Sequence, residues 1–196
     1  MTTRICVLRS GGEYKPEHVQ LLSKQIPCLV CLSDVPVEGV KTIPLSQNWP
    51  GWWSKLELFR PDIEGDLLYF DLDTVVLGAV DELEVGETTM LSDFFRPQLL
   101  ASGLMYISER DKSHVWTEFT KSPIQHIRRC TTRHSWGDQG FLSGVLSPKR
   151  WQDLLPNKVV SYKVHCRYGL PDNALVVCFH GYPRPWQAKE GWVPKC

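Results

Sequence analysis

The stretch Asp-Leu-Leu-Tyr-Phe-Asp-Leu-Asp-Thr-Val-Val-Leu, residues 66–77, decides the fold. The apolar run Leu67–Phe70 predicts a buried strand, and a second apolar run, Thr74–Leu77, follows directly after the acidic pair Asp71 and Asp73. Asp is depleted in strands, and a carboxylate beside an apolar run must be solvated, paired or metal-bound. The acidic pair therefore marks the end of a buried strand as a candidate site.

A strand, a helix and a second strand precede this stretch. Arg4–Leu8 and Cys28–Leu32 predict strands, and the intervening helix begins at Pro16 and carries its apolar residues on one face. This is a βαβ unit, which requires a parallel sheet. The alternating elements predict a doubly wound α/β sandwich, a sheet between two layers of helices. Further strands are expected at 89–91, 104–107, 159–163 and 175–179, and helices near 113–120 and 138–146.

A helix is also expected over 52–59. Trp52, Leu56 and Phe59 share one face at the α-helical spacing, and Lys55 and Glu57 lie on the opposite, polar side. A lysine on such a side is either a surface residue or one that reaches a ligand.

Composition limits the possible classes of protein. The 196 residues, 42% of them hydrophobic, suffice for one domain, 1–196, with halves at about 1–80 and 81–196. Equal numbers of acidic and basic residues, 22 each, exclude long-range attraction to a polyanion. The basic stretch His126–Arg129 with Arg133 and His134 reads as a solvated loop, although it leaves nucleic acid open as a partner.

The N-terminus and the cysteines favour a cytoplasmic protein. Only four apolar residues follow Arg4, too few for a signal peptide or a transmembrane helix. The cysteines are irregularly spaced, so a cysteine-based metal site is poorly supported. Those in apolar runs are expected to be reduced core residues: Cys6, Cys28, Cys31 and Cys178.

The acidic pair fits more than one chemistry. Its oxygens suit Mg²⁺ or Mn²⁺, and an Asx turn that closes the strand is the structural alternative. The pair also resembles the nucleophile strand of haloacid-dehalogenase-like phosphatases, with Asp71 as nucleophile. In those enzymes the motif lies on the strand that opens the core domain, whereas seventy residues precede Asp71 here.

A second candidate segment lies near the C-terminus. The apolar run Val176–Phe179 leads into His180-Gly181-Tyr182-Pro183-Arg184-Pro185-Trp186. Gly181 allows the backbone to approach a ligand, Arg184 offers charge to a phosphate, and His180 could complete a metal site or serve as a hydrogen-bonded structural residue.

Several motifs, taken in order, resemble the family 8-like, retaining GT-A glycosyltransferases. They cover nearly the whole chain and comprise Lys55–Pro61, Tyr69–Asp73, Ser102–Met105, Asp138–Gln139 and His180–Trp186. The chain departs from the family at Arg184, where the family usually has Lys. Arginine should still neutralise a diphosphate, as a planar fork.

The resemblance implies an α/β, GT-A-like fold, with a Rossmann-type mixed and mostly parallel sheet sandwiched by helices. It also implies a metal site and a catalytic set. Asp71, Asp73 and His180 would hold Mn²⁺ or Mg²⁺ against the donor diphosphate. Asp138 and Gln139 would orient sugar hydroxyls near the anomeric carbon, unless Asp138 only caps its helix, and Arg184 would assist departure of the diphosphate.

The resemblance also implies donor contacts along the chain. Ser102 and Gly103 would run past the bound sugar, Lys55 would approach the donor, and the N-terminal loop would hold the nucleoside. The expected donor-binding residues are Ser10, Gly11, Tyr14, Lys55, Asp71, Ser102, Gly103, Gly181, Arg184 and Trp186.

The implied activity is metal-dependent transfer of a sugar from a nucleotide sugar, a UDP-sugar, with retention by front-face substitution. The acceptor stays open among a glycan, a lipid-linked saccharide, a protein and a modified DNA base. Two other functions stay open as well: the phosphatase, and a non-catalytic module that binds a sugar nucleotide or a glycan. Five tryptophans fall near the expected site and could stack on sugars or bases: Trp49, Trp52, Trp53, Trp136 and Trp186.

Overall fold

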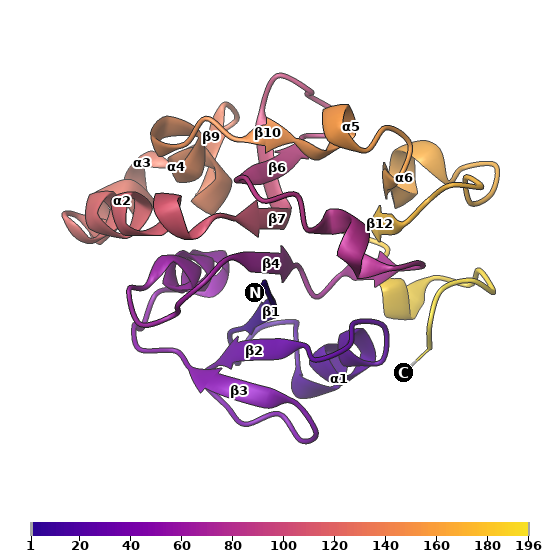
Figure 1. Ribbon diagram of the computed structural model, residues 1–196, viewed down its shortest axis with the longest axis horizontal. Coiled ribbons are helices and arrows are strands. Elements are labelled where there is room, and N and C mark those ends of the chain that lie inside the picture. Colours follow the sequence, from indigo (N-terminus) through magenta and orange to yellow (C-terminus); the bar gives the residue numbers. More distant parts are fainter. Residues whose placement is uncertain (1, 196) are drawn as a thin grey trace.

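A seven-stranded sheet runs through the centre of the computed structural model, which describes residues 2–195 (Figure 1). The strand order is β10-β6-β7-β4-β1-β2-β3. The bounds are Thr3–Leu8 for β1, Val30–Ser33 for β2, Lys41–Pro44 for β3, Leu67–Phe70 for β4, Thr89–Ser92 for β6, Leu100–Ile107 for β7 and Lys149–Arg150 for β10.

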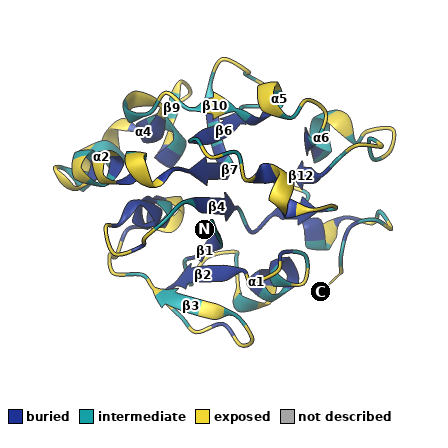
Figure 2. Cartoon of the chain, in the orientation of Figure 1, coloured by how far each residue is buried: buried dark blue, intermediate teal, exposed yellow. Residues whose placement is uncertain are grey.

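The sheet is mixed and mostly parallel, as predicted. β1 pairs in parallel with β2 and β4, β2 with β3, and β10 with β6, while β7 runs antiparallel to both β4 and β6. Every residue of β2 and β4 is buried, which explains why these strands read as continuous apolar runs (Figure 2). The exposed edge strand β3 has no such run, and it was not predicted.

Helices cover both faces of the sheet. The helix α1 (Pro16–Ser23) packs against Cys6, Leu8 and Phe70 on one face. The other face meets α2 (Glu109–Thr120), α4 (Gly137–Val145) and the 3₁₀ helix η1 (Gly51–Phe59). The remaining short elements are α3 (Pro123–Arg129), β8 (Thr131–Thr132), β9 (Ser135–Trp136), α5 (Trp151–Leu154), α6 (Tyr162–His165), η2 (Val80–Leu83) and η3 (Pro185–Gln187).

A second, three-stranded sheet brings the C-terminal segment to the acidic pair. Its order is β11 (Val159–Ser161), β12 (Val176–Cys178) and β5 (Thr74–Val76), and β12 runs antiparallel to β5. The Phe179 amide also donates a hydrogen bond to the Asp73 carbonyl, at 3.2 Å. The chain after β12 therefore starts beside the turn that follows β4.

The helix expected over 52–59 is a 3₁₀ helix, and its predicted buried face is right at Leu56 and Phe59 but wrong at Trp52. Three residues per turn place Trp53, Leu56 and Phe59 on the buried side, with 5%, 0% and 1% of their surfaces exposed. Trp52, which the α-helical spacing assigned to that face, is 49% exposed.

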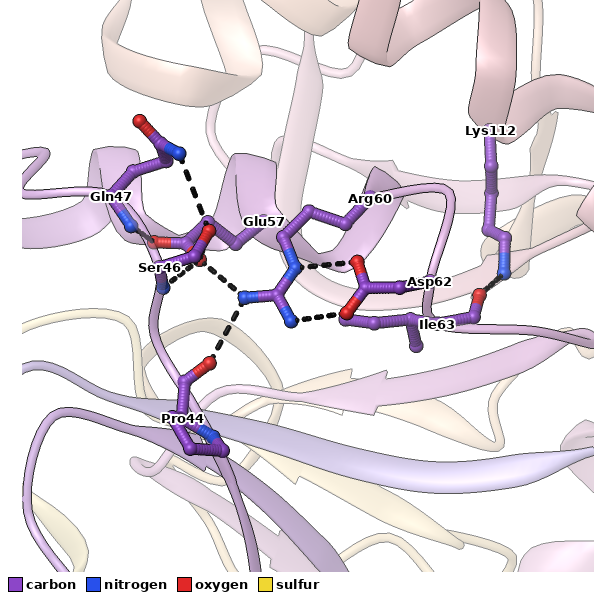
Figure 3. A network of polar contacts seen from close by, with 8 residues as sticks. All are labelled: Pro44, Ser46, Gln47, Glu57, Arg60, Asp62, Ile63 and Lys112. Carbon is purple, nitrogen blue, oxygen red and sulfur yellow. Dashed lines mark hydrogen bonds and ion pairs between the residues drawn. The ribbon is translucent and has the colours of Figure 1, made fainter.

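Glu57, which was expected on the polar side, is fully buried in a hydrogen-bonded network (Figure 3). Its carboxylate accepts hydrogen bonds from the backbone amides of Ser46 and Gln47, at 2.6 and 3.0 Å, and pairs with Arg60 at 2.8 Å. Arg60 also pairs with Asp62 at 2.7 Å. A buried carboxylate is stable only with such partners, and here they tie η1 to the loop after β3.

Three further expectations need correction. The strand expected to reach Lys163 ends at Ser161, whose side chain accepts a hydrogen bond from the Val164 amide and begins α6. The basic stretch at 126–129 belongs to α3 and is not a loop. Cys28 is exposed, with a positive φ of 57°, so only Cys6, Cys31 and Cys178 of the predicted set are buried.

Within residues 2–195, no helix has the length and apolar content that a membrane crossing needs.

Candidate active site

A cleft of about 480 Å³ opens at the carboxyl end of β4. This is where ligands bind in open α/β sheets. Most of the residues singled out in the sequence line it: Tyr14, Lys55, Asp71, Asp73, Ser102, Gly103, Asp138, Gln139, His180, Gly181 and Arg184.

The acidic pair lies on a tight turn directly after β4. The Asp71 amide donates to the Gly103 carbonyl at 2.9 Å, and the Thr74 amide donates to the Asp71 carbonyl at 3.1 Å. This turn leaves both carboxylates at the cleft, where the side chain of Asp71 is 28% exposed and that of Asp73 is 7% exposed.

Lys55 joins two of the cleft carboxylates. Its ammonium lies 2.8 Å from Asp71 and 3.8 Å from Asp138, and it donates to the Ser102 hydroxyl at 3.3 Å. Burial opposes the charged form of Lys55, but Asp138 and Asp71 raise its pKa above the ordinary value. Lys55 is therefore a charged group of the site, and the surface-lysine alternative is wrong.

Asp138 belongs to the same cluster and does not cap α4. Trp136 is the N-cap residue, and the Asp138 carboxylate accepts a hydrogen bond from the Ser102 hydroxyl at 2.6 Å. Burial raises the pKa of Asp138, and Lys55 opposes that rise.

Arg184 links the C-terminal segment to the N-terminal loop. Its Nε and Nη2 donate to the two oxygens of Glu13, at 3.1 and 2.8 Å, and its Nη1 donates to Asp73. The guanidinium also lies over the rings of Tyr14 and Tyr182, 5.1 and 5.2 Å from their centroids. The hydrogen bond from Arg184 lowers the pKa of Glu13.

Asp73 is a buried carboxylate of the cleft, with 5% of its surface exposed. Burial and the charge of Asp71 raise its pKa, and Arg184 opposes that rise. The two carboxylates of the acidic pair thus have different partners: Asp71 pairs with Lys55, and Asp73 pairs with Arg184.

His180 lies in the cleft in a constrained conformation. Its φ is +30°, its ring stacks on Phe94 with centroids 5.3 Å apart, and its Nε2 is hydrogen-bonded to the Ser161 hydroxyl at 2.5 Å. Burial and the nearby Lys163 lower its pKa to about 4, so the ring is neutral at pH 7. In residues 2–195, no three His, Cys, Asp or Glu side chains converge as a ligand set, and His180 does not join Asp71 and Asp73 in one.

Three of the expected donor-binding residues do not line the cleft. The Ser10 amide and hydroxyl both donate to Asp34, at 2.8 and 2.7 Å, and Gly11 lies beside it. Trp186 stacks on His18 with ring centroids 3.8 Å apart. It also contacts Tyr14 edge to face, with ring centroids 5.9 Å apart. Of this loop, Gly12, Glu13 and Tyr14 reach the cleft.

Sequence reasoning missed Phe94 and Phe95, and it placed Glu13 in the N-terminal loop without its ion pair to Arg184; all three residues line the cleft. Glu13 follows a glycine pair, but nothing in that pattern predicts a partner 171 positions away. Two of the five tryptophans that were noted, Trp52 and Trp136, line the cleft, whereas Trp49 and Trp53 belong to the core.

No protein-family model and no curated protein matches this sequence. Solved structures do match. The galactosyltransferase LgtC, solved with donor and acceptor sugar analogues, has 11% identity and a TM-score of 0.64 over 96% of this chain and 90% of its own.

Two more structures show how widely the fold is shared. The glycosyltransferase GlyE of Streptococcus pneumoniae has 14% identity and a TM-score of 0.64 over 95% of this chain, which spans only 57% of GlyE. Mouse xyloside xylosyltransferase 1 has 9% identity and a TM-score of 0.52 over 92% of this chain and 98% of its own. The protein therefore has the fold of the GT-A glycosyltransferases.

Proposed function

We propose that this protein is a metal-dependent glycosyltransferase that moves a sugar from a nucleotide sugar, a UDP-sugar, to an acceptor with retention. The observation that carries the proposal is the meeting of Asp71, Asp73 and Arg184 in one cleft, at the ligand-binding edge of this fold. Fold alone does not define an activity, so the argument rests on the charges of this site.

The charge balance of the cleft suits a divalent cation. Four carboxylates, those of Glu13, Asp71, Asp73 and Asp138, are joined by ion pairs to two cations, Lys55 and Arg184. The excess is two negative charges, which would repel a donor diphosphate. Mn²⁺ or Mg²⁺ held by Asp71 and Asp73 would offset it and would supply Lewis-acid stabilisation of the leaving diphosphate. His180 would join them as a third ligand only after its Nε2 leaves the Ser161 hydroxyl, because the three side chains do not converge in this structure.

The protein's own groups have separate roles in this proposal. Arg184 binds the diphosphate and stabilises the charge that develops on it. Asp138 and Gln139, at the start of α4, face the sugar and orient its hydroxyls. Gly103 lies directly beside Asp71, since a Cβ atom at this position would be in van der Waals contact with the Asp71 carboxylate, at 3.4 Å.

Thermal melting with a panel of nucleotide sugars, with and without Mn²⁺, tests the proposal. We expect a UDP-sugar to raise the melting temperature only when the metal is present, because ligand binding stabilises the folded state. The protein should also hydrolyse that donor slowly in a metal-dependent reaction.

Two variants test the metal ligands separately. Asp71→Asn and Asp73→Asn should each abolish the metal-dependent hydrolysis, whereas Asp172→Asn, at an exposed position outside the cleft, should not. Full activity of either cleft variant contradicts the metal assignment. Absence of stabilisation by any nucleotide sugar contradicts the function, and metal-dependent stabilisation without turnover indicates the non-catalytic module.

A further inference from the structure

Three exposed aromatic side chains border the cleft. Trp52, Trp136 and Phe95 are 49%, 51% and 60% exposed, and all three line the cleft although they come from η1, β9 and the loop after β6. The two indole rings have centroids 6.2 Å apart and planes tilted by 42°. We call these three residues the aromatic rim.

The aromatic rim is held in place by the backbone beneath it. A Cβ atom at position 137 would lie 2.7 Å from Trp52 Nε1, so Gly137 is required for the indole to pack there. The φ of Gly137 is +61°, which also favours glycine, and its amide donates to the Cys130 carbonyl at 2.8 Å. Trp52 thus packs against Gly137 while half of its surface faces solvent and is open to a flat ligand.

Cations adjoin the aromatic rim. The segment 119–137, which ends beside Trp136, contains no Asp or Glu although the chain as a whole is neutral. Arg96, next to Phe95, donates to the carbonyl of Arg133 at 2.6 Å and so ties the two sides of the rim together. Arg96 lies 3.7 Å from Asp93, whereas Arg133 is an exposed residue between β8 and β9.

We propose that the aromatic rim binds the acceptor, and that the acceptor is a glycan that carries carboxylate or phosphate groups. The inference rests on the proposed function, because it assumes that the donor occupies the part of the cleft around Asp71 and Arg184. Indole faces pack against the apolar faces of sugar rings, and the arginines pair with acidic substituents.

A glycan fits the aromatic rim better than a nucleic acid does. Two indoles tilted by 42° present non-parallel faces, which suit successive sugar rings of a bent chain more than a stack of parallel bases. A nucleic acid carries a phosphate at every unit and needs an extended basic track, whereas this chain has zero net charge.

The charge requirement is tested with a matched pair of probes on the full chain. Tetragalacturonate carries a carboxylate on every ring, and its methyl ester has the same rings without the charges. We expect tetragalacturonate to quench tryptophan fluorescence and to bind at least about tenfold more tightly than the ester. Equal binding of the two, no binding of either, or tighter binding of single-stranded oligothymidylate overturns the inference.

Variants assign the binding to the aromatic rim. Trp136→Ala and Trp52→Ala should each weaken the binding of tetragalacturonate by about tenfold, whereas Trp136→Phe retains most of it. Arg133→Gln should remove much of the preference for the acid over the ester. Tyr168→Ala and Arg110→Gln change an exposed aromatic and an exposed arginine elsewhere and should have no effect.

Failure of this inference is separable from failure of the proposed function. If the wild-type protein is stabilised by a UDP-sugar with Mn²⁺ but does not bind tetragalacturonate, only the acceptor inference fails. If no nucleotide sugar stabilises it, the proposed function fails whatever the glycan does.

Discussion

At the scale of single residues, the side chains that contact Arg184 explain why this position holds an arginine. Its Nε and Nη2 pair with both oxygens of Glu13 while its Nη1 reaches Asp73. A lysine has one compact ammonium and cannot make this planar, two-sided contact. Glu13 therefore gives a physical reason for arginine at the position where the resembling family usually has lysine.

We expect Arg184→Lys to weaken the binding of UDP by about tenfold, because the ammonium cannot hold Glu13, Asp73 and a diphosphate in the same geometry. Titration calorimetry in the presence of Mn²⁺ measures the change. In a Glu13→Gln background the same substitution should reduce UDP affinity by less, since the carboxylate that pairs with two nitrogens of the guanidinium is already absent. Equal costs in the two backgrounds would show that Glu13 and Arg184 act independently.

At the scale of the element, the 3₁₀ geometry of η1 determines which side chains reach the cleft. With three residues per turn, Lys55 lies on the same side as Trp52, and both line the cleft. Glu57 lies on another side and is buried against the loop after β3. The network around Glu57 thereby anchors the helix that carries both Lys55 and Trp52.

We expect Glu57→Gln to lower the free energy of unfolding by about 3 kcal/mol, because a neutral amide cannot accept all the hydrogen bonds that the buried carboxylate accepts from Ser46, Gln47 and Arg60. Urea unfolding measures this change. Glu64→Gln, at an exposed position of the following loop, is the matched control and should change stability little. Equal stability of the two variants would mean that the network is not needed for folding.

At the scale of the whole molecule, the C-terminal segment is docked by its own small core. Phe179, Ala188 and Val193 belong to one buried cluster, and Tyr162 stacks on Phe179 with centroids 4.2 Å apart. The Tyr162 hydroxyl donates to Glu190 at 2.5 Å. This docking holds the segment that carries His180 and Arg184 against the end of β4.

The Tyr162–Glu190 hydrogen bond predicts a pH dependence of stability. It raises the pKa of Tyr162 to about 12 and lowers that of Glu190. The Tyr162 contribution is complete below the unfolded pKa of tyrosine, about 10, and is lost as the pH rises through about 12. The Glu190 contribution is complete above the unfolded pKa of glutamate, about 4.3, and is lost as the pH falls through its lowered folded pKa.

Tyr162→Phe should therefore reduce the free energy of unfolding by about 1 kcal/mol between pH 5 and pH 9. The difference from wild type should shrink above about pH 10, where the wild-type protein loses this contribution. Denaturant unfolding at pH 7, 9 and 10.5 measures it. A difference that is the same at all three pH values would show that the hydroxyl contributes only through packing.

Local pattern was sufficient for much of the fold and part of the site. Apolar runs predicted β1, β2, β4, β6 and β12, because a buried strand needs apolar side chains wherever it lies in a sheet. The position of Asp71 and Asp73 directly after β4 was predicted for the same reason. The edge strand β3 and the short α3 have no continuous apolar run, and they were missed.

The sequence by itself determined the α/β architecture and the location of the acidic pair, because buried strands and helices need apolar residues at regular spacings along the chain. Only the tertiary structure decided which charges meet. It paired Arg184 with Glu13, moved Ser10 and Gly11 out of the cleft, placed Trp186 on His18 and gave η1 its 3₁₀ winding. An ion pair or a ring stack depends on the distance between side chains after folding, and no local pattern encodes that distance for residues far apart in the chain.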